Sequence, residues 1–210
     1  MLALAMAYPE NCFPMMGLHP GSVKENYEEE LKLVEAELSR QKFYAVGEIG
    51  IDLYWDKTFI REQKIAFQKQ IAMAKKHALP IVIHMRNSFN ETYEIVEALN
   101  DEELSGIFHC FSGSLEQAKK IISLGGFKLG IGGVLTFKNS GLDEVIREID
   151  IKHLVLETDS PYLAPVPYRG KRNESAYLVN VAEKLAELHH ISIEEVANIT
   201  TENSKVVFGI

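Results

Sequence analysis

The sequence predicts an α/β protein, built as a β/α barrel of the TIM type. Six short apolar runs recur along its 210 residues, and stretches with helical periodicity separate them. Successive runs start about 21 to 37 residues apart, the length of one strand with its crossover helix. Imidazole and carboxylate side chains close several of these runs, and β/α barrels build their active sites at such strand ends.

The predicted strands are short and rich in apolar residues. In chain order they are Phe13–Leu18, Phe43–Glu48, Pro80–His84, Gly106–Cys110, Phe127–Ile131 and His153–Glu157. The last four are nearly continuous in apolarity, as strands buried on both faces of a parallel sheet require. Strands that alternate with helices at this period indicate either a barrel or a doubly wound sheet.

The intervening helices carry signals of their own. One apolar stripe at helical spacing consists of Ile60, Phe67, Ile71, Ala74 and Ala78. Ser114 with Gln117 fits a capping box that opens a further helix, and Ser192 with Glu195 opens another near the end of the chain. Residues 1–8 read as the last turns of an apolar-faced helix that Pro9 closes.

The chain is expected to form one domain over residues 1–210, since no linker or low-complexity segment interrupts it. A complete barrel needs eight strands and about 250 residues, whereas six strands are visible here. We therefore expect an N-terminally truncated barrel whose chain begins two βα units late.

Composition narrows the classes of protein. No apolar run is long enough for a transmembrane helix, and two cysteines make no disulfide framework, so a cytoplasmic location is expected. A net charge of −8 argues against broad electrostatic binding to nucleic acid. A local basic loop can still hold a phosphate, and no obligate protein partner is evident.

Four chemically active side chains lie at predicted strand ends: Glu48, His84, His109 and Asp159. A single histidine that closes an apolar strand is usually a hydrogen-bonded core residue. Four imidazole and carboxylate groups at the same end of a sheet favour a metal site instead, with one or two divalent ions such as zinc, magnesium or manganese. Such an ion activates water for hydrolysis.

Two of the carboxylates are candidates for catalysis. Asp159 heads the loop after the last predicted strand, so it is the best candidate for the base that takes the proton of the attacking water. Its alternative role is a turn cap, common for Asp before Ser-Pro. Glu48 is placed to bridge two ions.

Several basic residues are candidates for contacts with substrate. His19 lies at a strand end, where phosphate contact and loop packing are both open. Arg86 follows His84 by two residues and can pair with phosphate or with a nearby carboxylate. Arg169 and Arg172 belong to a basic loop that is either solvated surface or a set of positioning contacts to backbone phosphates.

Six motifs, spread in order over nearly the whole chain, resemble the TatD family of metal-dependent deoxyribonucleases, a branch of the amidohydrolase-like barrels. They are Gly17-Leu-His-Pro, Gly47-Glu-Ile-Gly-Ile-Asp, Ile83-His-Met-Arg, His109-Cys-Phe-Ser-Gly, Glu157-Thr-Asp-Ser-Pro-Tyr-Leu and Arg169-Gly-Lys-Arg-Asn-Glu. The resemblance implies a β/α barrel with one or two metal ions that hydrolyses phosphodiester bonds in DNA. It places Glu48, His84, His109 and Asp159 at the family's ligand positions, and His19 near the substrate phosphate.

The sequence departs from the family pattern in lacking the His-x-His pair of the first strand. Glu48, His84 and His109 can still hold one ion, whereas a second ion would keep Asp159 and a bridging Glu48. Two alternatives therefore stay open beside the deoxyribonuclease. The same activated water could hydrolyse another ester or an amide bond, or the truncated chain could have little activity.

Overall fold

The computed structural model describes all residues of the chain, 1–210. They fold into two compact units, unit 1 comprising Met1–Ile107 with Gly209 and unit 2 comprising Phe108–Phe208 with Ile210. Strands and helices alternate along the chain, and the strand pair within each unit is parallel. The predicted α/β class is thereby confirmed. None of the helices is both long enough and apolar enough to cross a membrane.

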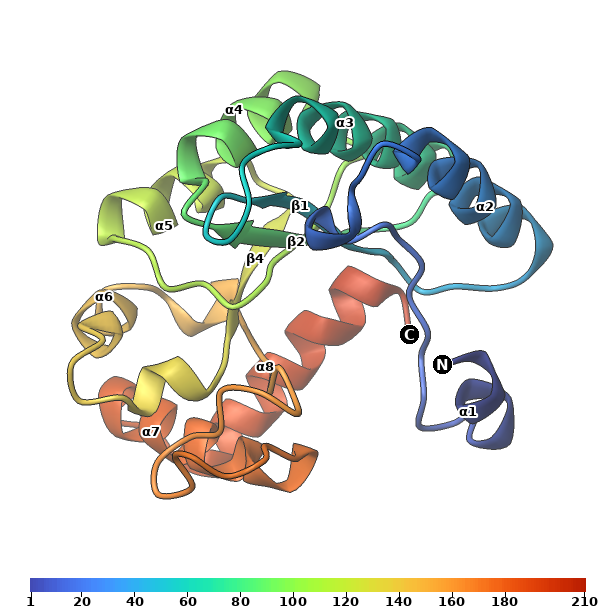
Figure 1. Ribbon diagram of the computed structural model, residues 1–210. Coiled ribbons are helices and arrows are strands. Elements are labelled where there is room, and N and C mark those ends of the chain that lie inside the picture. The colour runs from blue at the N-terminus through green and yellow to red at the C-terminus, as the bar shows by residue number, and fades with distance from the viewer. The chain divides into compact units, whose positions relative to one another are not determined.

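Unit 1 contains the first two long strands and the helices around them (Figure 1). Its elements are α1 (Leu2–Ala7), η1 (Pro20–Ser22), α2 (Tyr27–Arg40), β1 (Val46–Asp52), α3 (Ile60–Lys76), β2 (Ile81–Arg86) and α4 (Phe89–Leu99). The short strand β3 (Gly106–Phe108) begins in unit 1, and its last residue belongs to unit 2. The crossover helix α3 joins β1 to β2 and packs on β1, and α2 packs against α3.

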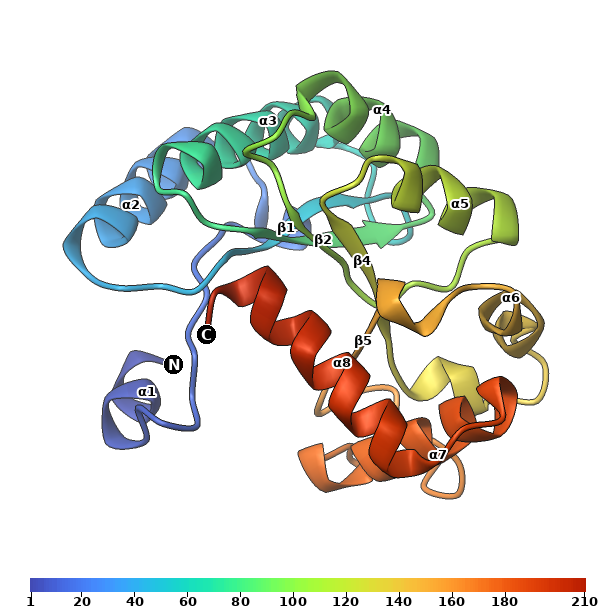
Figure 2. The same ribbon diagram turned by 180° about the vertical axis from the view of Figure 1, so that it is seen from behind.

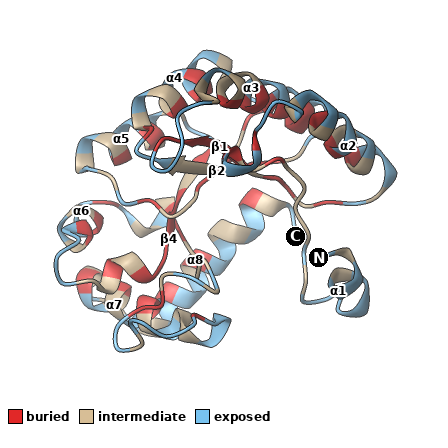
Figure 3. Cartoon of the chain, in the orientation of Figure 1, coloured by how far each residue is buried: buried red, intermediate tan, exposed pale blue.

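The predicted apolar stripe of α3 forms much of the core of unit 1. Phe67, Ile71 and Ala74 are buried, and Figure 3 shows buried residues along β1 and on one side of α3. The helix ends at Lys76, so Ala78 lies beyond it with a left-handed backbone (φ 51°). Burial of this stripe fixes the helix against the strand that carries the site.

The strands β1 and β2 run side by side in a register that places Gly50 opposite His84 and Asp52 opposite Arg86. Gly50 has a φ of 142°, and a side chain there would collide with the backbone carbonyl of His84. Glycine is therefore required at this position, because only a residue without Cβ allows both the backbone angle and the close approach.

Unit 2 contains a second parallel strand pair and the C-terminal helices. Its elements are α5 (Leu115–Ser123), β4 (Phe127–Ile131), η2 (Gly133–Thr136), α6 (Leu142–Arg147), η3 (Ile151–His153), β5 (Leu154–Leu156), η4 (Ser175–Tyr177), α7 (Leu178–His189) and α8 (Ile193–Phe208). Gly130 of β4 lies opposite Val155 of β5. Figure 2 shows α7 and α8 side by side, and α8 also packs on β5.

Both predicted capping boxes are present. The Gln117 N–H donates to Oγ of Ser114, and the Ser114 N–H donates to Oε1 of Gln117, which begins α5. The same reciprocal pair joins Ser192 and Glu195 at the start of α8. These bonds satisfy backbone donors that a helix start leaves without partners.

The structure corrects the first of the six predicted strands. Over Phe13–Leu18 the chain makes one isolated parallel bridge, between Met16 and Val46, so five strands remain. Pro14 has no N–H to give to a ladder, which explains why the pairing stays short. The helix predicted over residues 1–8 is present as α1, and none of its residues is buried. The single domain and the two missing βα units stay predictions.

Candidate active site

His84 lies in β2, and a carboxylate from β1 orients its ring. Its Nε2 is 2.9 Å from Oδ2 of Asp52, a largely buried residue. Burial alone would raise the pKa of Asp52, but hydrogen bonds from the Tyr54 N–H and from His84, together with nearby positive charge, leave that pKa lowered. Because an ionised carboxylate only accepts hydrogen bonds, Nε2 of His84 carries the ring proton and Nδ1 presents a lone pair.

His19 lies beside His84 and presents an N–H donor where His84 presents a lone pair. Its Nδ1 accepts a hydrogen bond of 3.0 Å from the Gly21 N–H at the start of η1, so the neutral ring holds its proton on Nε2. That Nε2 is 3.3 Å from Nδ1 of His84. His19 therefore donates toward the site, and the tautomers fixed by Asp52 at one end and by Gly21 at the other are compatible.

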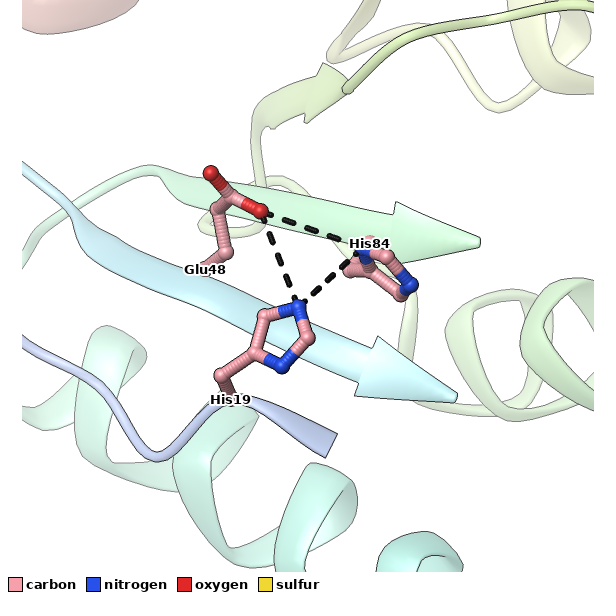
Figure 4. A group of neighbouring side chains, drawn as sticks. All are labelled: His19, Glu48 and His84. Carbon is pink, nitrogen blue, oxygen red and sulfur yellow. Dashed lines mark hydrogen bonds and ion pairs between the residues drawn. The ribbon is translucent and has the colours of Figure 1, made fainter. Parts of the chain in front are cut away.

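Glu48 of β1 completes this group, which Figure 4 shows converging on one place. Its Oε2 is 3.8 Å from Nδ1 of His84 and 3.9 Å from Nε2 of His19. A point equidistant from the three atoms lies about 2.1 Å from each, which is the length of a zinc–nitrogen or zinc–oxygen bond. By distance, the group fits a divalent ion.

The hydrogen bonds narrow which of these atoms would be ligands. His84 has the arrangement typical of a metal-binding histidine, with one ring nitrogen donating to a carboxylate and the other presenting a lone pair. Glu48 adds a carboxylate oxygen. His19 holds its proton on the inward nitrogen, so it suits an anionic oxygen better than an ion. The distances alone would admit His19 as a ligand, but the tautomer decides against it.

Two buried glutamines of α3 hold the segments that carry this group. The Leu18 N–H donates to Oε1 of Gln70 at 2.6 Å, and Nε2 of Gln70 donates to the Leu18 carbonyl at 3.1 Å. Two turns earlier, Oε1 of Gln63 accepts from the Asp52 N–H at 2.9 Å. The helix thus fixes the backbone beside His19 and the carboxylate that orients His84.

Substitution of Gln70 by Leu tests how much its two hydrogen bonds to Leu18 contribute to stability. The change leaves the buried N–H and carbonyl of Leu18 without partners, and each such group costs about 1–3 kcal/mol. We expect the free energy of unfolding, measured by urea titration, to fall by at least the cost of one unpartnered group, about 1–3 kcal/mol. The control is Gln68→Leu on the exposed side of the same helix. Equal urea midpoints for the two variants would show that the hydrogen bonds of Gln70 do not contribute to stability.

In unit 2, His109 is oriented by Glu157, just beyond β5. Its Nδ1 is 2.9 Å from Oε2 of Glu157, whose Oε1 accepts from the Cys110 N–H at 2.6 Å. A side chain at Gly130 would collide with the Glu157 carboxylate, so β4 makes room for this pair. His109 accordingly donates through Nδ1 and presents the lone pair of Nε2.

Asp159 lies next to that lone pair. Its Oδ1 is 3.3 Å from Nε2 of His109, so two acceptor atoms face each other, an arrangement that a shared cation would satisfy. The residue has a left-handed backbone (φ 58°), which Asp adopts more readily than most residues. The Tyr162 N–H donates to the Asp159 backbone carbonyl at 2.8 Å and forms a turn. This bond does not involve the side chain, so the cap that was the alternative role for the Asp159 carboxylate stays a prediction.

Asn173 fastens this turn to the basic loop. Its buried side-chain Nδ2 donates to the carbonyls of Thr158 and Tyr162, both at 2.7 Å, and its own N–H donates to the Pro161 carbonyl. One amide therefore spans the segment on either side of Asp159, which restricts the position of that carboxylate.

The predicted arginines differ in their surroundings. Arg169 lies 3.8 Å from the ring centroid of Phe137 and donates to the Ala164 carbonyl, so part of its role is packing. Arg172 is exposed on the same loop. In unit 1, Arg86 lies 3.8 Å from the ring centroid of Tyr54. The structure brings His19, Glu48 and His84 together in unit 1, and His109 and Asp159 together in unit 2.

The residues that orient these side chains were not predicted from the sequence. Asp52 and Glu157 stand inside quoted motifs, and their place at strand ends was the available signal. Gln63 and Gln70 interrupt an apolar helix face at a spacing of two turns, which could have marked them as buried polar groups. Asn173 carried no such signal, since it lies in a polar loop.

Comparison with known proteins places the chain among hydrolases. The profile of the TatD-related DNase family matches residues 1–209. The metal-dependent hydrolase YabD of Bacillus subtilis is 42% identical over 199 residues, which cover 94% of this chain and 78% of that protein. The metal-dependent hydrolase YcfH of Escherichia coli is 36% identical over 197 residues, covering 92% and 72%.

Solved structures agree with these relatives. The crystal structure of YjjV, a TatD homologue from Escherichia coli, matches with a TM-score of 0.90 at 30% identity and covers 99% of this chain and 82% of that one. An amidohydrolase from Saccharomyces cerevisiae, 17% identical with a TM-score of 0.77, covers 98% and 84% and shares the fold. The predicted α/β fold of the β/α-barrel type is thereby confirmed. The chain belongs to the TatD-related DNase family of metal-dependent hydrolases.

Proposed function

We propose that this chain hydrolyses phosphodiester bonds in DNA, with one or two divalent ions held by Glu48, His84, His109 and Asp159. The observation that carries the proposal is the inward N–H of His19 beside the lone pair of His84 and the carboxylate of Glu48. A donor next to ligand atoms suits a substrate oxygen that bears negative charge, as phosphoryl oxygens do. The family description points to the same substrate.

The side chains of the site have different roles in the proposed hydrolysis. A bound divalent ion would lower the pKa of water and polarise the phosphorus–oxygen bond. The carboxylate of Asp159 takes the proton from the attacking water, whose oxygen bonds to phosphorus as the bond from phosphorus to the leaving sugar oxygen breaks. The proton held on Asp159 then passes to that leaving oxygen, and His19 donates through Nε2 to a non-bridging phosphoryl oxygen. Asp52 and Glu157 keep His84 and His109 in the tautomers that present lone pairs.

A cleavage assay tests the proposal. The full chain, treated with a chelator and then supplied with magnesium, manganese or zinc, is incubated with end-labelled single- and double-stranded oligonucleotides. We expect cleavage that requires the ion and is lost in Glu48→Gln. Absence of DNA cleavage with every ion, together with metal-dependent hydrolysis of an ester or amide substrate, would replace this function by the broader hydrolase alternative.

The basic loop provides a second test. If Arg172 contacts a backbone phosphate, Arg172→Ala should weaken binding of all DNA sequences alike. It should also reduce the slope of log affinity against log salt concentration by about 0.7–0.9. Arg172 is the suitable probe, because replacement of Arg169 would also remove its packing on Phe137. Arg147→Ala, an exposed arginine of α6, is the control. An unchanged salt slope would remove this loop from the DNA interface.

The proposal includes a cytoplasmic location. Cys12 and Cys110 form no disulfide, which suits a reducing compartment where DNA is accessible. Fractionation of cells that express the chain with an epitope tag would test this, and recovery outside the cytoplasm would contradict it.

A further inference from the structure

A hollow of about 310 Å³ opens in unit 1 beside the candidate active site. His19 and His84 form one side of it, and Trp55, Phe59 and Arg86 line other parts of its wall. Its volume is at the lower end of the range of small-ligand sites, about 300–1,000 Å³. The hydrolysis proposed above uses His19 and His84 and gives no role to Trp55, Phe59 or Lys24.

The aromatic wall is open to solvent. Trp55 is the only tryptophan of the chain, and 77% of its surface is exposed. Tyr54 packs edge-on against it with ring centroids 4.6 Å apart. Tyr54 and Trp55 lie two and three residues after the end of β1, so these large apolar rings are positioned close to a strand end, and their hydrophobic surface is not buried within unit 1.

A cation lies against these rings. The guanidinium of Arg86 is 3.8 Å from the ring centroid of Tyr54 and 5.5 Å from that of Trp55. The Arg86 backbone is fixed as well, since its carbonyl accepts from the Leu53 N–H at 2.9 Å and the residue pairs with Asp52 in the strand register. An exposed arginine fixed in this way can bind an anion without a large loss of side-chain freedom.

A second cation, which also lies against an aromatic ring, lines the same hollow. Lys24 lies 5.3 Å from the ring centroid of Phe59 and 3.7 Å from Oδ2 of Asp56, in a half-exposed ion pair that solvent weakens. The hollow thus combines flat apolar rings, two cations, the carboxylates of Asp52 and Asp56, which face His84 and Lys24, and the inward N–H of His19. Proteins recognise an unpaired nucleotide by stacking its base on an aromatic side chain and by binding its phosphate with a nearby cation.

We infer that this hollow is a binding site for one unpaired nucleotide of the substrate, with its base stacked on Trp55 and its phosphate held by Arg86 and His19. The inference deepens the proposed DNA hydrolysis and rests on it for the identity of the ligand. Trp55 and Arg86 act here in binding and positioning, so their loss should raise KM more than it lowers kcat.

Tryptophan fluorescence tests stacking without any turnover. Because Trp55 is the only source of tryptophan emission, we expect a short oligothymidylate in chelator to quench it saturably. The same oligonucleotide without bases should quench it far less. If labelled oligothymidylate binds by polarisation while the emission stays constant, the base does not lie on Trp55 and the inference is overturned.

Steady-state kinetics separate this inference from the proposed function. On single-stranded DNA, Trp55→Ala should raise KM by about 5- to 150-fold, the range expected for one base–aromatic stack, whereas Trp55→Phe should restore most of the affinity. Tyr8→Ala, at an exposed aromatic residue just after α1, is the control. On a substrate with an abasic unit at each end, wild type and Trp55→Ala should have equal KM.

The possible failures are distinct. Wild-type cleavage of DNA with an unchanged KM in Trp55→Ala would overturn the nucleotide site and leave DNA hydrolysis intact. Absence of cleavage by the wild type would refute DNA hydrolysis, and the fluorescence titration would then decide on its own whether the hollow binds a base. Since Trp55 is exposed, an unchanged thermal midpoint in Trp55→Ala is expected and shows that lost binding is not lost folding.

Discussion

Asp159→Asn is expected to lower kcat for DNA cleavage by about 10²- to 10⁴-fold, the contribution of a well-placed general base, and to change KM little. Asn fits the turn, because it adopts the left-handed backbone as readily as Asp and keeps the carbonyl that accepts from the Tyr162 N–H. It removes the negative charge and the ability to take a proton. The loss therefore reports chemistry and not folding.

The experiment on Asp159 needs a control variant and a measurement of stability. Asp143→Asn in the first turn of α6 is the matched control, because it makes the same chemical change away from the site. Thermal unfolding of Asp159→Asn should resemble that of the wild type. If kcat stays within about twofold of the wild type under saturating metal, the proton acceptor lies elsewhere. The turn role of Asp159 would then be sufficient to explain its place.

Much of the fold was predictable because the chain repeats one simple pattern. Buried parallel strands need continuous apolarity, and crossover helices need an apolar stripe, so both leave periodic signals in the sequence. Capping boxes are equally local, and both predicted boxes are present. The segment from Phe13 to Leu18 has the apolarity of a strand but pairs only at Met16. Pairing depends on a partner far along the chain, which periodicity does not reveal.

In the site, too, local features could be predicted from the sequence, whereas contacts between distant residues could not. His84 and His109 were predictable because a strand end is a local feature. Their ligand atoms were not, because the tautomer of each ring depends on a carboxylate 32 or 48 residues away in the sequence. His19 is the exception, since the backbone N–H that makes it donate toward the site belongs to Gly21, only two residues away. Arg169 was expected at phosphate, and its stack on Phe137 gives it a structural task as well.

Asp52→Asn is expected to weaken metal binding by about 10- to 100-fold, although Asp52 itself faces His84 and is not a proposed ligand. An Asn side chain can turn its NH₂ group toward Nε2 of His84. The ring would then accept at Nε2 and hold its proton on Nδ1, the atom that is 3.8 Å from Oε2 of Glu48. A protonated Nδ1 cannot bind an ion, so the variant loses a ligand without losing the residue.

Two measurements separate this tautomer effect from a general disturbance of unit 1. Competition with a chelating dye gives the metal affinity, and nitrogen NMR of labelled histidine gives the protonated ring nitrogen of His84. Asp56→Asn in the loop after β1 is the control, since it is the same change on an exposed residue. If Asp52→Asn binds metal as the wild type does while the proton has moved to Nδ1, then His84 is not a ligand. His109, whose own tautomer Glu157 fixes in the same way, would then be the remaining imidazole among the four proposed ligand residues.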